Sequence, residues 1–260
     1  MGDAPLLPAA RRDPLPDRIA VLADIHGNSA ALRAVLRDLD AVEPQALLVL
    51  GDHFSGPLDA GGTAGLLLAR PCHALRGNHD RHLLDLPPEE MGPSDRVAHD
   101  ALPDAARDWL RHLPPALDFG DVWACHATPQ DDATYWTHVA TAEGQVAPRS
   151  RSDIAARAQG LSAALLLCAH THLPGIWRLP TGQLLLNPGS VGCPAYDDDQ
   201  PIPHVVEAGH PQASYALVSR QGVGWQVSLR HIPYDATAMA ARARAHGRES
   251  WARAVTLGHL

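Results

Sequence analysis

Short, largely apolar runs that each end in a polar turn predict three strands, at residues 18–23, 46–50 and 72–75. Runs of this length without alternation are typical of strands buried on both faces of a parallel sheet. After the first run, apolar residues recur at helical spacing behind a capping residue, Asn28 or Ser29, and residues 63–70 predict a second helix. This alternation of strand and helix predicts right-handed crossovers and one parallel sheet.

The second half of the chain is dominated by short strands and turns. Three strand pairs are predicted: residues 117–119 with 122–125, residues 176–178 with 183–186, and residues 214–220 with 225–231 around the turn 222–224. A further strand is expected at residues 165–168 and a helix at residues 235–245. Because no repeat and no interdomain linker interrupts the pattern, we expect residues 18–260 to form a single domain.

Composition narrows the class of protein. The 260 residues are 45% hydrophobic and 19% charged, as in a soluble globular protein, and no apolar run is long enough to span a bilayer. Residues 1–17 are rich in proline and polar residues, so we expect a disordered lead-in rather than a signal peptide or membrane anchor. A net charge of −8 without a basic block argues against long nucleic acid as a partner. Four cysteines spaced singly fit reduced thiols in a cytoplasm.

Side chains that bind metal ions follow the ends of the predicted strands. There are two aspartates, one asparagine and four histidines: Asp24, His26, Asp52, Asn78, His126, His170 and His172. Seven ligands are more than one ion needs and suit two ions. Two pairs stand at i and i+2, which on an extended backbone would point to one face. Taken singly, each motif also fits a surface turn, a helix cap or a polar loop.

Taken in order, these motifs resemble those of a known family. The segments DIHGN (24–28), GD (51–52), GNHD (77–80), a lone histidine at 126 and HTH (170–172) are similar to the calcineurin-like metallophosphoesterase superfamily. The closer resemblance is to its small bacterial and archaeal phosphodiesterase-like branch, whose chains also carry an NPGS segment, here residues 187–190. The resemblance runs from about residue 18 to residue 234. It implies an α/β fold, a four-layer α/β/β/α sandwich of two facing mixed β-sheets.

The resemblance also implies a dinuclear metal centre. One ion would be held by Asp24, His26, Asp52 and His172, and the other by Asp52, Asn78, His126 and His170, so that Asp52 bridges the two. Mn or Fe suits this mixed ligand set best, and Zn or Ni are alternatives. The implied reaction is attack of a metal-bridging hydroxide on a small phosphodiester, such as a cyclic nucleotide or a nucleotide-derived ester.

Five further residues have expected roles around this centre. His79 would donate a proton to the leaving alkoxide or stabilise the phosphate, and Asp80 would either orient His79 or cap the next helix. Asn28 would hold the first ligand loop by side-chain hydrogen bonds. His53 is either a polar group of the pocket wall or a partner of a backbone carbonyl. Arg76 either clamps a substrate phosphate or forms a surface ion pair.

Two other functions stay open on the sequence. A phosphomonoesterase would use the same metal core, and a non-catalytic protein-binding scaffold would keep only the fold. The complete ligand set favours an enzyme over a scaffold. Residues 51–57 read GDHFSGP, without the arginine of the protein serine/threonine phosphatases, which disfavours that branch. The expected partner is a small phosphorylated substrate, with no membrane; an edge strand in the late hairpin would allow a homo-oligomer.

Overall fold

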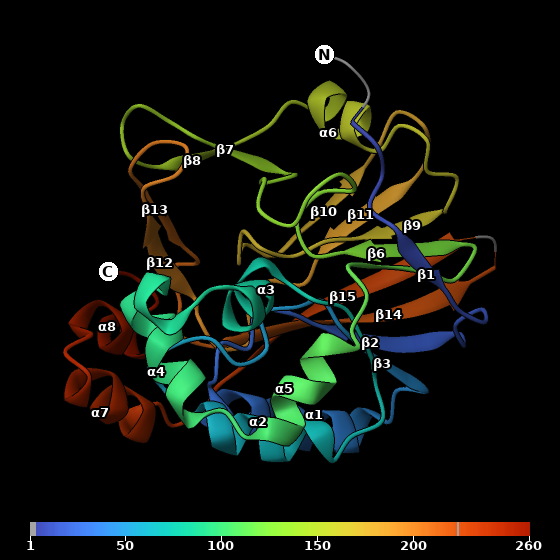
Figure 1. Ribbon diagram of the computed structural model, residues 1–260. Coiled ribbons are helices and arrows are strands. Elements are labelled where there is room, and N and C mark those ends of the chain that lie inside the picture. Colours follow the sequence, from blue (N-terminus) through green and yellow to red (C-terminus); the bar gives the residue numbers. More distant parts are fainter. Residues whose placement is uncertain (1–3, 223) are drawn as a thin grey trace.

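The computed structural model describes residues 4–222 and 224–260, and two large sheets dominate it (Figure 1). The first sheet has the strand order β15 (Gly224–Ile232), β14 (Ala213–Gln221), β2 (Arg18–Leu22), β3 (Ala46–Val49) and β4 (His73–Ala74). Strands β2, β3 and β4 are parallel, as the sequence predicted, while β14 runs antiparallel to both β2 and β15. Of the predicted turn between β14 and β15, Val223 lies outside the described residues.

The second sheet is also mixed. Its order is β1 (Ala9–Arg11), β5 (Ala116–Asp118), β6 (Val122–Cys125), β9 (Leu165–Leu167), β11 (Leu184–Asn187) and β10 (Gly175–Arg178). The pairs β6–β9 and β9–β11 are parallel, whereas β5–β6 and β10–β11 are antiparallel. The predicted hairpin of residues 117–125 is therefore confirmed as β5 and β6.

The first strand of this sheet corrects an expectation. Residues 9–11 pair in parallel with β5, from Ala9 opposite Ala116 to Arg11 opposite Asp118, and Leu15 is buried between the two sheets. The prediction of a disordered lead-in over residues 1–17 is thus wrong for this segment. Backbone pairing at the edge of β5 and the packing of Leu7, Ala10 and Leu15 on the cores together hold this segment. That residues 18–260 form a single domain stays a prediction.

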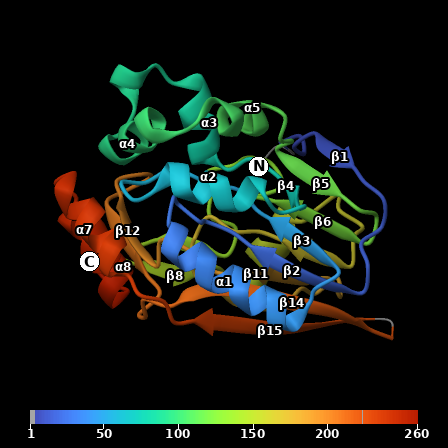
Figure 2. The same ribbon diagram turned by 90° about the horizontal axis from the view of Figure 1, so that it is seen from below.

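Strict alternation of side chains builds the layers. In β2, Ile19 and Val21 face the second sheet, while Ala20 and Leu22 face the helices. In β9, Leu165 and Leu167 face the first sheet, and Leu166 packs on the outer face beside Trp136. The two sheets therefore share one core and each has a second core on its outer side, which confirms the predicted four-layer arrangement. Figure 2 shows α1 and α2 lying across the first sheet.

The helices are unequally divided between the two outer layers. They are α1 (Ser29–Val42), α2 (Ala60–Leu68), α3 (Asn78–Asp85), α4 (Pro93–Ala101), α5 (Asp104–Arg111), α6 (Arg151–Arg157), α7 (Thr237–Ala245) and α8 (Glu249–Leu257), with a 3₁₀ turn at Pro88–Glu90. Only the seven-residue α6, among the described helices, joins the core on the outer face of the second sheet. Within the described residues, none of the helices combines the length and apolarity needed to cross a membrane.

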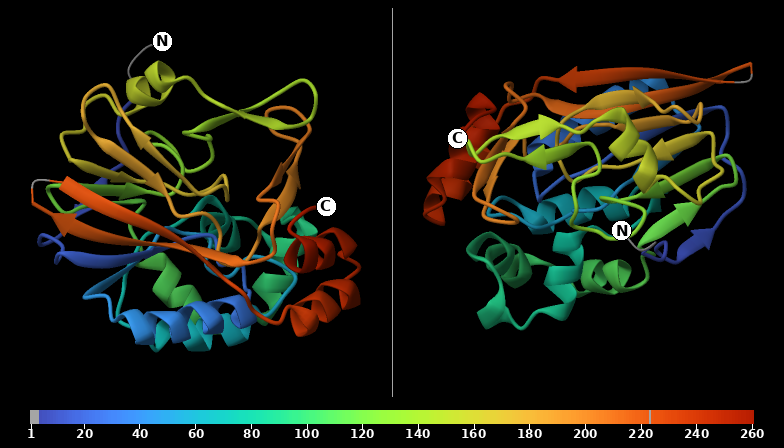
Figure 3. Two further views of the ribbon diagram at one scale, coloured as in Figure 1. Left: turned by 180° about the vertical axis from the view of Figure 1, so that it is seen from behind. Right: turned by 90° about the horizontal axis from the view of Figure 1, so that it is seen from above.

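Two small ribbons lie at one end of the molecule. They are β7 (His138–Ala140) with β8 (Val146–Pro148), and β12 (Ala195–Asp198) with β13 (His204–Glu207). Strand β13 contacts β8, and β12 contacts α8, so the ribbons and the C-terminal helices form a continuous wall (Figure 3).

Candidate metal centre

The turns after β2, β3, β6 and β9 and the start of α3 bring the seven predicted ligands together. Their ligand atoms fall into two groups, each within 4.8 Å: Asp24, His26 and His172 in one, and Asp52, His126 and His170 in the other. Asn78 joins the second group, since its Oδ1 lies 3.0 Å from His126 Nε2. Asp52 Oδ2 lies 3.7 Å from His26 Nε2 and 3.4 Å from His126 Nε2, between the two groups. All seven side chains are buried.

The backbone at these ligands is left-handed. Among the described residues, six that are not glycine have positive φ, and five of them are predicted ligands: Asp24 (51°), His26 (49°), Asp52 (52°), His170 (68°) and His172 (56°). The expectation of two ligand pairs on extended backbone is therefore wrong. Each left-handed residue costs about 1–2 kcal/mol, and such strain concentrates at functional sites.

Backbone carbonyls fix the orientation of three imidazoles. The bonds run from His172 Nδ1 to Cys193 O (2.5 Å), from His126 Nδ1 to Leu50 O (2.7 Å) and from His170 Nε2 to Ala133 O (2.7 Å). A carbonyl only accepts, so in each ring the bonded nitrogen carries the proton. In the neutral ring the other nitrogen keeps its lone pair for a cation, which is the usual arrangement of metal-binding histidines.

Two features of the first group call for a cation. His26 Nε2 and His172 Nε2 lie 3.1 Å apart, so two ring nitrogens converge on one point. Both carboxylate oxygens of Asp24 are fully buried and have no hydrogen-bond partner among the described residues. Burial raises the pKa of Asp24 well above its usual value, although His126 opposes the shift. An unpaired buried carboxylate is costly, and a bound divalent ion would satisfy it, so these residues fit a metal.

In the second group a proton and a metal ion would compete for the same atoms. Burial opposes ionisation of both Asp52 and His126, but their mutual attraction outweighs it. The pKa of Asp52 is held well below its usual value, and the pKa of His126 is raised to about 10. Because histidine binds a metal only in its neutral form, an ion that entered here would displace the proton of His126.

Asp80 does not hold His79; it holds the loops that carry the ligands. Its carboxylate accepts hydrogen bonds from the backbone N–H groups of Asp52 (2.8 Å), His53 (3.0 Å) and Gly77 (2.9 Å) and from His53 Nδ1 (2.7 Å). The prediction that it orients His79 is wrong, and the alternative role at the start of α3 is confirmed. His53 is fully buried against Asp80 and Trp109, so neither role predicted for it is correct.

The residue that does orient His79 is Asp95, which sequence reasoning missed. Asp95 lies in the first turn of α4, and its two carboxylate oxygens are 2.9 and 3.0 Å from His79 Nδ1. Burial alone would lower the pKa of His79, but Asp95 and Asp52 raise it to about 9. For the acid Asp95 the effects are reversed: burial would raise its pKa, but the neighbouring His79 lowers it to about 2. His79 is therefore held as a cation beside the centre.

Two asparagines connect the ligand loops. Asn28 caps α1 through Ala31 N (3.0 Å) and donates to Gly192 O (2.9 Å), as predicted for a residue that holds the first loop. Asn187 donates to Ala169 O (2.9 Å), next to the paired histidines. Each asparagine side chain donates and accepts at once, which aspartate cannot do. Arg76 forms no ion pair in the part of the chain that the structure describes, so the predicted surface ion pair is wrong, and the clamp on a substrate phosphate stays a prediction.

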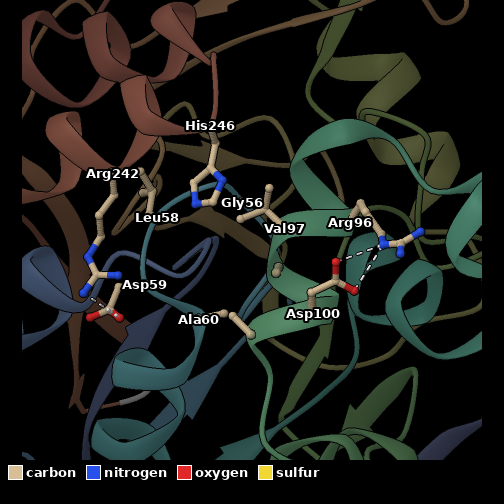
Figure 4. A pocket seen from close by; sticks show the side chains of 11 residues that line it. Gly56, Leu58, Asp59, Ala60, Arg96, Val97, Asp100, Arg242 and His246 are labelled. Atoms are coloured by element: carbon tan, nitrogen blue, oxygen red, sulfur yellow. Dashed lines mark hydrogen bonds and ion pairs between the residues drawn. The ribbon is translucent and has the colours of Figure 1, made fainter.

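A pocket of about 360 Å³ lies between the start of α2, α4 and α7 (Figure 4). Its walls combine apolar side chains such as Leu58 and Val97 with Arg242 and His246. None of the seven predicted ligands lines this pocket, but its wall residue Gly56 is close to the ligand loop: a Cβ atom added there would lie 2.8 Å from the backbone carbonyl oxygen of His26.

Two facing mixed sheets with aspartate, asparagine and histidine gathered at their strand ends define an α/β protein with a divalent metal centre. Residues 18–219 match the family model described as the calcineurin-like phosphoesterase superfamily domain. The chain belongs to this superfamily, which places it among the phosphoester hydrolases. The recognition made from the sequence motifs is thus confirmed.

Solved structures share the fold. A metallophosphoesterase from Sphaerobacter thermophilus is 22% identical, with 93% of this chain and 99% of that chain covered, at a TM-score of 0.70. A putative diadenosine tetraphosphatase is 17% identical, with 86% of this chain and 98% of that chain covered, at a TM-score of 0.52. No curated protein matches the sequence.

Proposed function

We propose that the chain is a dinuclear metal-dependent hydrolase of small phosphodiesters, either cyclic nucleotides or nucleotide-derived esters. The observation that carries this proposal is the convergence of two buried ligand groups on Asp52, together with the unpartnered carboxylate of Asp24. Mn or Fe is the proposed metal, because oxygen and imidazole ligands are mixed in both groups. Four free cysteines, three of them buried, support a reducing compartment such as the cytoplasm.

Two bound divalent ions would lower the pKa of water so that it can attack phosphorus near neutral pH, and would offset charge on the phosphoryl oxygens. Asp24, His26 and His172 would hold one ion, and Asn78, His126 and His170 the other, with Asp52 shared. The protein keeps these side chains in place through the hydrogen bonds of Asn28, Asp80 and Asn187, so that no ligand has to move far.

His79 supplies the proton for the leaving group. Its Nδ1 is engaged by Asp95, which leaves Nε2 to donate. With a pKa raised to about 9, His79 carries that proton at neutral pH. Its side chain is 38% exposed, so a substrate can reach it, whereas the metal ligands beneath are buried. Asp95 acts through His79 and is a positioning residue.

The charges around the centre favour a diester over a monoester. A monoester carries close to two negative charges at neutral pH, and a diester carries one. Arg81 acts electrostatically on Asp52, but both oxygens of Asp132 hold its guanidinium, at 2.7 and 2.9 Å. An arginine that is already neutralised adds little attraction for a second charge. The pocket beside Gly56 would receive the organic part of such an ester.

The test is an assay of the chelator-stripped protein with Mn²⁺ added back, on one model diester and one model monoester. Asp52→Asn should abolish metal-dependent turnover, and Asp199→Asn, at an exposed aspartate, should leave it unchanged. Faster hydrolysis of the diester supports the proposal, and faster hydrolysis of the monoester replaces it with a phosphomonoesterase. Failure to turn over either ester, with two ions bound, would favour the scaffold.

A further inference from the structure

A third cluster of metal-binding side chains lies beside the centre. His79, His82 and Asp95 place one ligand atom each within 4.8 Å of one another, and none of the seven ligands of the dinuclear centre belongs to this cluster. His79 Nδ1 is 2.9 Å from Asp95 Oδ1, and His82 Nδ1 is 3.8 Å from Asp95 Oδ2. The cluster joins two helices, α3 and α4, which contact each other.

The arrangement has the form of a cation site. His79 and His82 stand at i and i+3 on α3, which puts both imidazoles on one face of the helix. Asp95 approaches from α4 with only 8% of its side chain exposed, while the two histidines are 38% and 30% exposed. A solvent ion can therefore reach a carboxylate that is itself held inside the protein. Two histidines and one carboxylate, with a position left for water, form a common zinc ligand set.

A purely structural role explains His82 poorly. At 3.8 Å its ring nitrogen is too far from Asp95 for a hydrogen bond. The Asp95 carboxylate already has a hydrogen-bond partner in His79, so a second histidine is not needed to compensate its burial. His82 instead contributes a third nitrogen or oxygen donor directed at the same point.

We propose that His79, His82 and Asp95 form a third, accessory site for a zinc-like divalent cation at the mouth of the dinuclear centre. When a cation binds there, His79 Nδ1 loses its proton to solvent and coordinates the cation. The hydrogen bond from His79 Nδ1 to Asp95 is then lost. Because the same Asp95 contact positions His79 for proton donation, occupancy of the accessory site inhibits hydrolysis. The enzyme is then slowed by excess zinc while its two catalytic ions remain bound.

The test counts zinc ions and does not depend on any substrate. Purified protein is dialysed to equilibrium against excess Zn²⁺, and metal and protein are quantified for wild type, His82→Ala and His112→Ala. His112 is an exposed histidine at the end of α5 and serves as the matched control. We expect wild type and His112→Ala to bind one more equivalent than His82→Ala. Equal equivalents in wild type and His82→Ala would overturn the proposal.

Inhibition gives a second readout. On a Zn²⁺ titration, wild-type turnover should fall at least tenfold, and His82→Ala should keep most of its activity over the same range. Circular dichroism and the unfolding midpoint show whether the half-exposed position 82 tolerates alanine, and His82→Asn replaces it if not. Loss of activity at the same Zn²⁺ concentration in wild type and in the folded variant would refute inhibition through this site.

Discussion

Replacing Asp95 with asparagine should slow esters with poor leaving groups far more than esters of p-nitrophenol. Asparagine keeps the shape of the side chain but removes the negative charge that both oxygens present to His79 Nδ1 at 2.9 and 3.0 Å. A hydrogen bond to a charged group contributes about 1.5–3 kcal/mol, which corresponds to roughly a 10- to 150-fold loss of kcat. A nitrophenolate leaves without help from an acid, so its hydrolysis should change by less than about threefold.

The assay measures kcat and KM on an alkyl phosphodiester and on a p-nitrophenyl phosphodiester, with Mn²⁺ saturating and trace zinc removed. KM should stay within about twofold, because Asp95 acts through His79 and does not touch the substrate. In His79→Asn the Asp95→Asn change should add almost nothing, since the two residues act as a unit. Equal losses on both esters, or additive losses in the double variant, would refute the general-acid role of His79.

Three further changes have expected outcomes. Asp24→Ala should raise the unfolding free energy of the chelator-treated protein by roughly 1–3 kcal/mol, because it removes an unpaired buried carboxylate; urea unfolding that shows a loss would contradict this. Asp38→Asn should cost about 0.5–1 kcal/mol at pH 7. Burial would raise the pKa of Asp38, but hydrogen bonds from Arg230 and Tyr215 lower it below its value in the unfolded chain. The carboxylate therefore stabilises the fold above the unfolded pKa, and the stability difference between wild type and variant should disappear as the pH falls through the folded pKa. A stability difference that does not change with pH would contradict this explanation. Gly77→Ala should weaken Mn²⁺ binding at least tenfold in calorimetry, because its Cβ would lie 2.1 Å from an Asp52 oxygen, whereas Gly65→Ala, with open space around it, should bind normally.

The sequence predicted the ligands because their positions follow from local rules. Strands β2 and β3 are short, apolar and parallel, so their carboxyl ends share one edge, and Asp24 and Asp52 must lie close together there. Later ligands such as His126 follow strands of the second sheet in the same way. The pattern of apolar runs and polar turns therefore predicted the parallel strands and the ligands at their ends, whereas the four layers and the division of the ligands between two ions came from the resemblance to the superfamily.

Long-range contacts explain what the sequence did not predict. Asp95 lies in α4 and His79 in α3, with a 3₁₀ turn between the two helices, so their separation along the sequence does not predict the contact. Strand β1 has the sequence AAR, which has no apolar pattern typical of a strand. It pairs with β5 through the backbone, and such pairing cannot be read from side chains. The left-handed backbone at His170 and His172 was also not predicted, since residues other than glycine adopt it uncommonly and the surrounding structure decides where they do.

The left-handed ligands have an evolutionary consequence. At about 1–2 kcal/mol each, five such residues hold roughly 5–10 kcal/mol of conformational energy, which is comparable to the entire stability of an ordinary domain. Glycine or asparagine at these positions would relax the backbone, and any neutral residue at position 24 would relieve a buried charge. Selection for stability alone would therefore remove these side chains one after another. A lineage that keeps all of them together is one in which the chemistry of the centre outweighs the gain in stability.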